Sequence, residues 1–396
     1  MMNKSVIAVN AREKAKISST GQTSMNVETN KSKSIRKKRI LYIVEAMGGG
    51  VFTYIVDLAN QLWDKYDVYI AYAVRPQTPE DYQDYFDKRI KLIEVKNFTR
   101  SIDLMKDAKA YLEIRKIANE IQPDIIHLHS SKAGVLGRWA FNGRKTPMFY
   151  TPHGYSFLMQ NYGWLKRTIY RIVELVTSKR CCTTISCSLG EHKETLKLTK
   201  MATFVNNGID IVALQRLVES CSVTNSEHQF TVFTLGRISY QKNPEQFNAV
   251  AEKLPDIRFL WIGDGELRDK ITSPNIEVTG WVNRDKALEY ALRADVFILT
   301  SLWEGLPIAL LESMYIRKIC VVSNVIGNKD VIQNGVNGYI CNNVDDYVNV
   351  LKSIQSNPNK TIIDKAYKDI LDEYNTSILG ERYRTVYSLI LKDLCT

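Results

Sequence analysis

The sequence has 396 residues, of which 45% are hydrophobic and 24% charged, a size and composition that allow two globular domains with separate cores. No apolar run approaches the roughly 18 to 20 residues that a membrane-spanning helix needs, and we expect no signal peptide either. The seven cysteines include no Cys-x-x-Cys pair, which favours reduced thiols in a cytoplasmic protein over a disulfide framework or a zinc site.

The net charge of +10 is unevenly distributed along the chain. Residues 1–39 carry ten Lys and Arg against two Glu, whereas residues 216–396 carry 20 against 23 acidic residues. Residues 1–38 are also rich in Ser, Thr and Asn and have no hydrophobic period, which predicts a disordered basic tail. The basic half favours an anionic partner surface, either a membrane or a nucleic acid. A solvated tail without a partner is the alternative.

The first predicted elements are a buried strand at residues 39–44, a glycine turn at Gly48-Gly49-Gly50 and an apolar-periodic helix at residues 51–63. Strand, glycine turn and helix are typical of a dinucleotide site. The spacing is not Gly-x-Gly-x-x-Gly, however, so an NAD-dependent oxidoreductase gains only weak support. Further strands are predicted at residues 68–73 and 90–95, followed by a helix at residues 103–121.

Two later strands end in histidine. One runs from Asp124 to His129-Ser130, and the other ends at Pro152-His153-Gly154. Strands that alternate with helices form a parallel sheet, and ligands bind outside the carboxyl ends of its strands. We therefore expect Gly48–Gly50, His129-Ser130 and His153-Gly154 to line one crevice. For His127, inside the apolar strand, a structural hydrogen bond is the preferred interpretation.

Residues 162–180 predict a helix with aromatic residues and a basic face. Such a helix can lie on an anionic membrane, although an ordinary amphipathic helix packed on the core is the default interpretation. The chain then continues through a strand and a helix to a short strand and turn at Asn206–Asp210, near which the charge changes sign.

A second alternation of strands and helices begins with a strand at residues 230–235. The following loop holds Arg237 and Lys242, and two fixed cations in such a loop can neutralise a diphosphate. The next strand, residues 257–262, leads to the glycine turn Gly263-Asp264-Gly265.

The segment 301–312 is the most informative of the chain. It follows a buried strand at 294–300, and a helix is predicted at 307–317 with Pro307 at its first position, where the missing N–H costs nothing. Gly305 permits close approach of the backbone, and the N–H groups of the first helical turn form an anion site. Glu304 and Glu312 would lie about 80° apart around the helix axis, so that both could face one ligand. A phosphate beside carboxylates suits a nucleotide sugar; the alternative is that Glu304 caps the helix and Glu312 is solvated.

From Arg39 to about Asp346 the chain resembles the GT-B glycosyltransferases of family 4. Five motifs in the family's order carry the resemblance: Gly48–Gly50, Pro152-His153-Gly154, Gly236-Arg237 with Lys242-Asn243, Gly263-Asp264-Gly265, and Glu304 with Glu312. The resemblance implies an α/β fold with two Rossmann-like parallel-sheet domains facing a central cleft. It implies an acceptor domain at residues 39–205, a nucleotide-sugar domain at 206–375, and a last helix, 376–396, that crosses back onto the first domain.

The resemblance also implies roles for the motif residues. Arg237 and Lys242 would bind the diphosphate, Glu312 the ribose, and Glu304 the hydroxyls of the donor sugar, while His153 would contact the sugar near its 6-position. The implied catalytic group is Glu304, His153, Lys242 and Arg237. The implied donor site also contains Gly263, Asp264, Gly305, Leu306, Pro307 and Glu312. Gly48–Gly50 would approach the donor phosphates or the acceptor, and His129 and Ser130 are acceptor-site candidates.

The implied reaction is retaining transfer of a hexose or N-acetylhexosamine from a UDP- or GDP-sugar to a lipid-linked saccharide in capsule, O-antigen or exopolysaccharide assembly. The enzyme would be cytoplasmic and peripheral at the inner face of the plasma membrane, without a nucleic-acid partner. The sequence contains no Asp-x-Asp, so we expect neither a metal nor another cofactor. The alternatives are an epimerase or phosphorylase of the same fold, an NAD-dependent oxidoreductase, and a basic nucleic-acid-binding protein.

Overall fold

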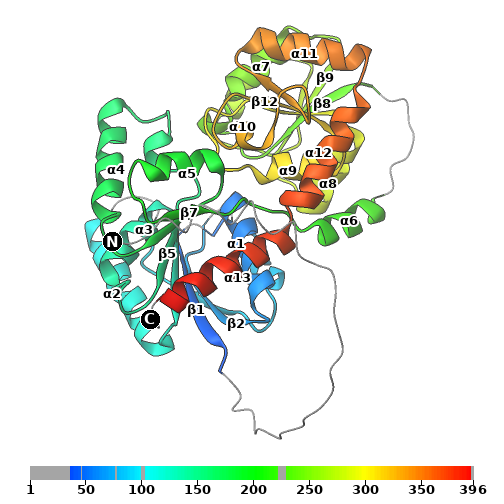
Figure 1. Ribbon diagram of the computed structural model, residues 1–396. Helices are drawn as coiled ribbons and strands as arrows, with labels where there is room; N and C mark the ends of the chain where they lie inside the picture. The colour runs from blue at the N-terminus through cyan, green and yellow to red at the C-terminus, as the bar shows by residue number, and fades with distance from the viewer. Residues whose placement is uncertain (1–35, 46, 76–77, 100–102, 222–228, 394–396) are drawn as a thin grey trace, which may run out of the picture. The chain divides into compact units, whose positions relative to one another are not determined.

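The computed structural model describes residues 36–45, 47–75, 78–99, 103–221 and 229–393. The predicted disordered tail lies outside these residues except for its last three, and the first strand already begins at Lys38. The described chain forms two parallel sheets with helices between successive strands (Figure 1). This confirms the predicted fold class. The predicted domain boundaries stay predictions.

The first sheet has the strand order β3-β2-β1-β4-β5-β6-β7, and each neighbouring pair is parallel. Its strands are β1 (Lys38–Val44), β2 (Tyr66–Tyr72), β3 (Lys91–Glu94), β4 (Ile125–His129), β5 (Met148–Thr151), β6 (Thr183–Ser186) and β7 (Ala202–Phe204). Alternate residues of β1 enter two cores on opposite faces of the sheet: Ile40 and Tyr42 belong to one, Leu41 and Ile43 to the other.

The helices of this first half follow the strands in order. They are α1 (Gly49–Leu62), α2 (Leu104–Ile121), α3 (Ser131–Ala140), α4 (Trp164–Thr177), α5 (Leu189–Leu196) and the short helices η1 (Tyr82–Tyr85) and η2 (Ser156–Leu158). α1 begins at Gly49, two residues before the predicted start, so two of the three predicted turn glycines are helical.

The second sheet repeats the pattern with the order β10-β9-β8-β11-β12-β13. Its strands are β8 (Thr231–Leu235), β9 (Arg258–Ile262), β10 (Ile276–Val278), β11 (Val296–Leu299), β12 (Ile319–Ser323) and β13 (Tyr339–Cys341). Its helices are α6 (Ile211–Ser220), α7 (Pro244–Glu252), α8 (Arg284–Arg293), α9 (Ile308–Tyr315), α10 (Asn328–Val331), α11 (Val344–Ser356), α12 (Lys360–Glu373), η3 (Tyr240–Lys242) and η4 (Arg268–Lys270).

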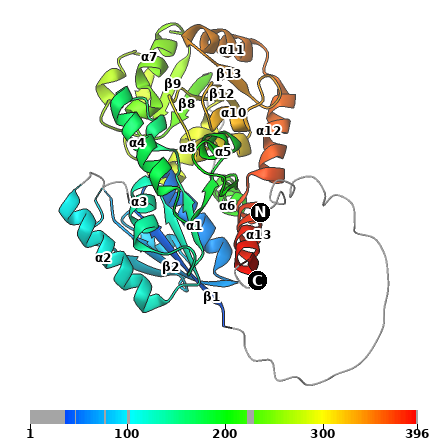
Figure 2. The ribbon, with the colours of Figure 1, turned by 60° about the vertical axis from the view of Figure 1, so that its left-hand side comes forward.

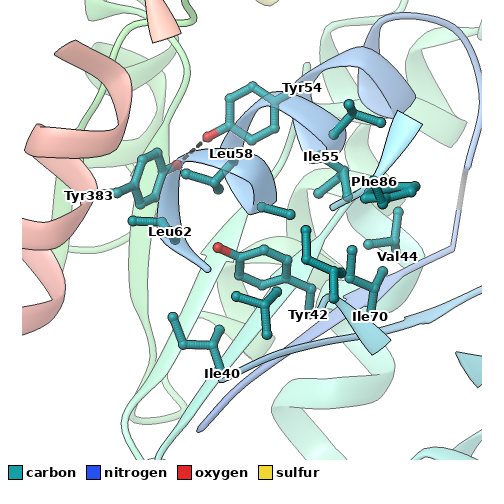
Figure 3. Packing of buried hydrophobic residues seen from close by; sticks show 14 of the residues in the cluster. Ile40, Tyr42, Val44, Tyr54, Ile55, Leu58, Leu62, Ile70, Phe86 and Tyr383 are labelled. Carbon is teal, nitrogen blue, oxygen red and sulfur yellow. Dashed lines mark hydrogen bonds between the residues drawn. The ribbon is translucent and has the colours of Figure 1, made fainter. Parts of the chain in front are cut away.

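The last helix, α13 (Thr376–Asp393), packs against α1 of the first half. Tyr383 and Tyr387 are fully buried in the core that also contains Tyr54 of α1. The hydroxyls of Tyr54 and Tyr383 point at one another and are hydrogen-bonded (Figure 3). The end of the chain therefore completes a core built mostly from its beginning.

The structure contradicts the default interpretation of the helix predicted at residues 162–180. α4 does not bury its apolar side: Leu165 and Ile172 are more than half exposed, whereas Glu174 and Thr177 are the residues of α4 that are buried. No helix among the described residues is both long and apolar enough to cross a membrane.

Candidate active site

Most of the predicted motifs follow the strands at which the strand order of each sheet reverses direction, and the His153 and Gly263 turns follow the neighbouring strands β5 and β9. In the first sheet the order reverses at the neighbouring pair β1 and β4, which is followed by Gly48 and Ser130. In the second it reverses at β8 and β11, followed by Gly236 and Thr300. Ligands of open parallel sheets bind at such switch points, outside the carboxyl ends of the strands.

Lys242 and Glu304 form an ion pair at the switch point of the second sheet. The Lys242 Nζ lies 2.7 Å from Glu304 Oε1, and the Ser301 hydroxyl donates to the same oxygen at 2.7 Å. The Gln241 amide donates to Glu304 Oε2 at 3.2 Å. Glu304 is buried, and three donors satisfy its carboxylate. Two motifs that are 62 residues apart in sequence thus meet through one partly buried charge pair.

Arg237 is also paired with a carboxylate, at the edge of the same site. Its Nε lies 2.8 Å from Glu266 Oε2, and both side chains are at least one-third exposed. An exposed ion pair contributes little to stability, so Arg237 can exchange Glu266 for another anion at small cost. Both predicted diphosphate ligands therefore have carboxylate partners that a diphosphate would share or replace.

The turn Gly263-Asp264-Gly265 braces the loop that carries Arg237. A Cβ at Gly263 would lie 2.3 Å from the Gly236 carbonyl oxygen, and a Cβ at Gly265 would lie 2.1 Å from the Ile238 carbonyl oxygen. The Asp264 carboxylate accepts from the Gly265 N–H at 2.8 Å and from Arg268 at 2.8 Å. These contacts give the glycines a packing reason for their identity; the donor-binding role of Gly263 and Asp264 stays a prediction.

Gly305 brings the second switch point against the histidine loop of the first. A Cβ at Gly305 would lie 3.4 Å from the Gly154 nitrogen and 3.5 Å from the His153 carbonyl carbon. The carbonyl of the next residue, Leu306, accepts a hydrogen bond from the Asn207 amide at 2.8 Å. The Glu304-Gly305-Leu306 segment is therefore held directly beside His153-Gly154.

The predicted helical relation between Glu304 and Glu312 is wrong. α9 begins at Ile308, and Pro307, with ψ of 120°, stands before the helix instead of at its first position. Glu304 therefore lies outside the helix, and the angle between the two carboxylates cannot be derived from helical spacing. Pro307 is not the first residue of the helix, as the sequence predicted, because its backbone is still extended.

Glu312 is paired and largely shielded from solvent, with 19% of its side chain exposed. Its Oε1 lies 2.7 Å from a guanidinium nitrogen of Arg284, at the start of α8. Burial raises the pKa of Glu312, while the charge of Arg284 opposes the shift. A ribose held by Glu312 would therefore also lie close to Arg284, a residue that the sequence did not single out.

His153 has both ring nitrogens near other protein groups. Its Nε2 lies 3.1 Å from His129 Nδ1, and its Nδ1 lies 3.6 Å from the Cys187 thiol. Burial lowers the pKa of His153 to about 3 and also lowers the pKa of His129, so both rings are neutral near pH 7. Contact between the His153 ring and a donor sugar requires the exchange of one of these partners.

His129 is fully buried behind His153, and the two rings stack at 5.3 Å. This position lets His129 orient the His153 ring. The next residue, Ser130, precedes α3 with a φ of 75°. The acceptor roles of His129 and Ser130 stay predictions.

The turn that presents His153 is fastened by a buried carboxylate. His153 has a φ of 55° and Gly154 a φ of 92°, both in the left-handed region. The Glu191 carboxylate accepts from the N–H of Gly154 and from the N–H of Cys187, each at 2.7 Å. Glu191 therefore holds the turn from α5, a role that a single Glu on a helix does not reveal in the sequence.

Gly49 and Gly50 leave open space at the start of α1. Apart from the adjacent residues and the backbone of α1 itself, no described heavy atom lies within 4 Å of the position that a Cβ would take at either residue. Gly50, unlike Gly49, has no positive φ, so alanine fits there without backbone strain. The space is available to a ligand that approaches the first turn of α1.

We expect Gly50→Ala to raise the KM for donor or acceptor several-fold, which corresponds to about 1 kcal/mol of lost binding free energy. The melting temperature should change no more than it does for an ordinary surface substitution. Steady-state kinetics with a thermal melt measures both. Gly163→Ala, at another glycine with open space around it, is the matched control. An unchanged KM for both substrates would show that no ligand reaches Gly50.

Asp57 of α1 is a buried carboxylate with one oxygen that has no hydrogen-bond partner in the described part of the chain. Burial raises its pKa from 3.8 to about 8, and Arg284, Asp210 and Glu312 are near enough to modify that shift. Because the folded chain keeps a proton that the unfolded chain releases above about pH 4, the contribution of Asp57 to stability falls as the pH rises through about 8.

We therefore expect Asp57→Asn to be more stable than the original chain by roughly 1–3 kcal/mol at about pH 9 and of similar stability at about pH 5. Thermal melts at the two pH values test this, with the exposed Asp64→Asn as the control. An equal difference at both pH values would contradict the assignment of the shifted pKa to Asp57.

Among the described residues no three His, Cys, Asp or Glu side chains form a group that could hold a metal ion. The residues that the sequence missed, Gln241, Ser301, Arg284, Glu191 and Cys187, are polar partners of the predicted ones. Gln241 and Ser301 lie within the predicted motifs that contain Lys242 and Glu304 and could have been found there, whereas Arg284, Glu191 and Cys187 come from distant parts of the chain.

Two family profiles cover most of the chain. The family described as "Glycosyltransferase Family 4" matches residues 48–212, and the one described as "Glycosyl transferases group 1" matches residues 219–369. The first profile covers β2 to β7 of the first sheet, and the second covers β8 to β13, the whole second sheet.

Named relatives and solved structures agree with the profiles. A UDP-Gal:alpha-D-GlcNAc-diphosphoundecaprenol alpha-1,3-galactosyltransferase of Escherichia coli is 29% identical over 77% of this chain and 85% of its own length. A Campylobacter jejuni alpha-1,4-N-acetyl-D-galactosaminyltransferase, named for a GalNAc-containing undecaprenol-diphosphate acceptor, is 25% identical over 80% of this chain and 88% of its own.

The fold matches that of sucrose-phosphate synthase from Thermosynechococcus elongatus, with a TM-score of 0.76 and 14% identity over 90% of this chain and all of that one. It also matches Anabaena Alr3699/HepE in complex with UDP and glucose, with a TM-score of 0.70 and 17% identity over 89% and 99% of the two chains. The chain is therefore a glycosyltransferase of the GT-B fold and of family 4.

Proposed function

We propose that this enzyme transfers a hexose or N-acetylhexosamine from a UDP- or GDP-sugar to a lipid-linked saccharide in the assembly of a cell-surface polysaccharide. Transfer retains the anomeric configuration and needs no metal, and the enzyme works as a peripheral protein at the inner face of the plasma membrane. The names of the Escherichia coli and Campylobacter jejuni relatives, both of which specify undecaprenol-diphosphate acceptors, support the lipid-linked acceptor.

The observation that carries the proposal is the partly buried Lys242–Glu304 pair with Gly305 packed against Gly154. Lys242, our proposed ligand of the diphosphate, and Glu304, our proposed ligand of sugar hydroxyls, thus lie beside the loop that carries His153. A donor bound across these groups would have its diphosphate on Lys242 and Arg237 and its sugar between Glu304 and His153. Fixed charges that face a leaving group stabilise the negative charge it develops.

In the proposed reaction the bond between the anomeric carbon and the leaving phosphate oxygen breaks, and a bond to the acceptor hydroxyl oxygen forms on the same face of the sugar. The leaving phosphate takes the proton of the acceptor hydroxyl, so the products are the glycosylated acceptor and a nucleoside diphosphate. No protein nucleophile is required. Lys242 and Arg237 neutralise the charge of the nucleoside diphosphate, the task that a bridging metal performs at other sites.

A thermal-shift panel tests the donor class. The full chain is heated with UDP, GDP, ADP, common nucleotide sugars, NAD or a DNA duplex, each with and without EDTA. A ligand at 100 times its dissociation constant adds roughly 2.7 kcal/mol to stability. We expect a shift with one nucleotide class that EDTA does not remove. A shift with NAD or DNA alone, or one abolished by EDTA, would overturn the proposal.

A further inference from the structure

The outer face of α4 is apolar, and no part of the described chain covers it. The exposed large apolar residues of α4 have between 41% and 78% of their surface accessible. They are Trp164, Leu165, Ile169, Ile172, Leu175 and Val176. Figure 1 shows α4 at the left edge of the ribbon, and Figure 2, with that side turned forward, shows it in front of its neighbours. A contiguous apolar face of this kind marks an interaction site.

The helix packs with its polar side inward. At 100° per residue the six apolar residues fall within an arc of about 140°, and Glu174 and Thr177 lie on the opposite side. Two partners satisfy the buried carboxylate of Glu174. Arg138 of α3 lies 2.6 Å from its Oε2, and the Tyr150 hydroxyl donates to its Oε1 at 2.8 Å. The buried ion pair fixes the rotation of α4 about its axis, so the apolar face is directed away from the protein.

The charges around this face select its partner. At 100° per residue, Arg171 lies about 20° beyond one edge of the apolar arc and Lys166 about 60° beyond the other. The one carboxylate of α4, Glu174, is buried. A second copy of α4 would bring the same cations together without a carboxylate between them. An anionic lipid surface supplies both an apolar phase for the arc and phosphates for its edges. Trp164, the most exposed of the six, has the ring type that gathers at membrane interfaces.

The helix is also connected to the candidate active site. Arg167 Nε donates to the Phe157 carbonyl in η2 at 3.0 Å, and η2 follows the His153-Gly154 turn. The Gln160 amide, just before α4, donates to the Leu302 carbonyl at 3.0 Å, close to Glu304 in the chain. A surface bound to α4 would therefore lie a short segment away from both loops of the site.

We propose that the outer face of α4 docks the enzyme onto an anionic lipid bilayer, with Trp164, Leu165 and Ile172 inserted among the lipids and Lys166 and Arg171 on the headgroups. The inference rests on the proposed function, which requires access to a lipid-borne acceptor. The outer face of α4 would be the surface through which the enzyme reaches that acceptor. Membrane binding would also explain why the apolar side of α4 faces outward and its polar side faces the protein.

The test compares two double variants of the full chain. Leu165→Glu/Ile172→Glu places charge in the middle of the apolar arc. Leu104→Glu/Met105→Glu places the same charge on two residues of α2 that are about 80% exposed. Co-sedimentation with vesicles of phosphatidylcholine plus phosphatidylglycerol should fall at least about tenfold for the α4 variant, since inserted apolar area sets much of the affinity, and should not fall for the α2 variant. Binding to pure phosphatidylcholine should be weaker throughout.

Two further readouts identify the contact. Lipids brominated in the acyl chains should quench part of the tryptophan fluorescence, and Trp164→Phe should remove that part. Sedimentation equilibrium without lipid should give the same mass for the original chain and the α4 variant. Unchanged vesicle binding by the α4 variant, or a dimer that the variant dissociates, would overturn the inference.

Donor binding separates this inference from the proposed function. The α4 variant should keep its thermal shift with the nucleotide and its rate on a water-soluble acceptor fragment, and should lose rate only on the lipid-linked acceptor in vesicles. If the original chain binds no nucleotide sugar, the proposed function fails. If it binds the nucleotide and the α4 variant still works normally on vesicles, only the docking surface is wrong.

Discussion

Lys242→Met is expected to lower the rate of transfer roughly 10²–10³-fold, the loss typical for a fixed group that stabilises developing negative charge. The substitution keeps the length of the side chain and removes the cation. Lys242 contacts Glu304 at 2.7 Å, and their side chains are only 17% and 8% exposed, so solvent screens the charge of Lys242 only weakly. The loss should appear in kcat/KM, measured by release of nucleoside diphosphate, and a rate above about one tenth of the original would contradict the role.

The fold must be monitored in the same experiment, because Lys242→Met also leaves a buried carboxylate without its cation. Ser301 and Gln241 still donate to Glu304, so we expect a loss of roughly 1–3 kcal/mol in stability. Lys242→Met/Glu304→Gln should recover much of that stability and none of the rate. Recovery of the rate would show that the pair only supports folding. Lys253→Met, at an exposed pair with Asp345, is the matched control.

Arg138→Met should cause the largest loss of stability, about 3–5 kcal/mol, because it leaves the buried Glu174 without a charge partner. Arg138 and Glu174 are 1% and 5% exposed, and the guanidinium also lies 4.2 Å from the centre of the Tyr150 ring. The free energy of unfolding, from denaturant titration, measures the effect. Since Glu174 orients α4, binding to anionic vesicles should weaken as well.

A second variant decides whether the charge or the packing is responsible. Arg138→Met/Glu174→Leu removes both charges and should be considerably more stable than Arg138→Met alone, because no buried carboxylate is left unpaired. Equal stability of the two would assign the loss to packing of the Arg138 stem. Arg258→Met, which breaks an exposed pair with Glu277, should change stability by no more than about 0.5 kcal/mol.

The fold could be predicted from the sequence because each strand, helix and turn is indicated by residues that are close together in the chain. Short β-branched runs followed by amphipathic helices and glycine turns repeat along both halves, and a parallel sheet is the arrangement that such an alternation favours. Element ends were less predictable. α1 begins at Gly49 and α9 at Ile308, because tertiary contacts at the strand ends outweigh the weak preferences of single residues such as Pro307.

The site could be predicted only as a set of strand ends. Gly48 and His153 follow strands of the first sheet, and Lys242 and Glu304 follow strands of the second. Parallel strands bring their carboxyl ends to one edge of each sheet. The partners of these residues could not be predicted, since they come from distant elements: Arg284 for Glu312, Glu191 for the His153-Gly154 turn, and Tyr383 for Tyr54. No spacing rule connects such pairs.

The orientation of α4 could not be predicted from the sequence, for a different reason. A helix with one apolar and one polar side reads the same in sequence whether the apolar side faces the core or the solvent. Only the buried partner of Glu174 distinguishes the two, and Arg138 lies 36 residues away. The default assumption of core packing therefore failed where two buried charges determine the orientation of the helix.

Metal-independent transfer with retention of configuration is tested most directly by the anomeric configuration of the product. The full chain is incubated in EDTA with the α-linked nucleotide sugar that gives the thermal shift and with a lipid-linked saccharide, and the new linkage is read from the anomeric proton coupling by NMR. We predict an α-linkage formed at the same rate with and without EDTA. A β-linkage, or transfer that stops in EDTA, would contradict the account.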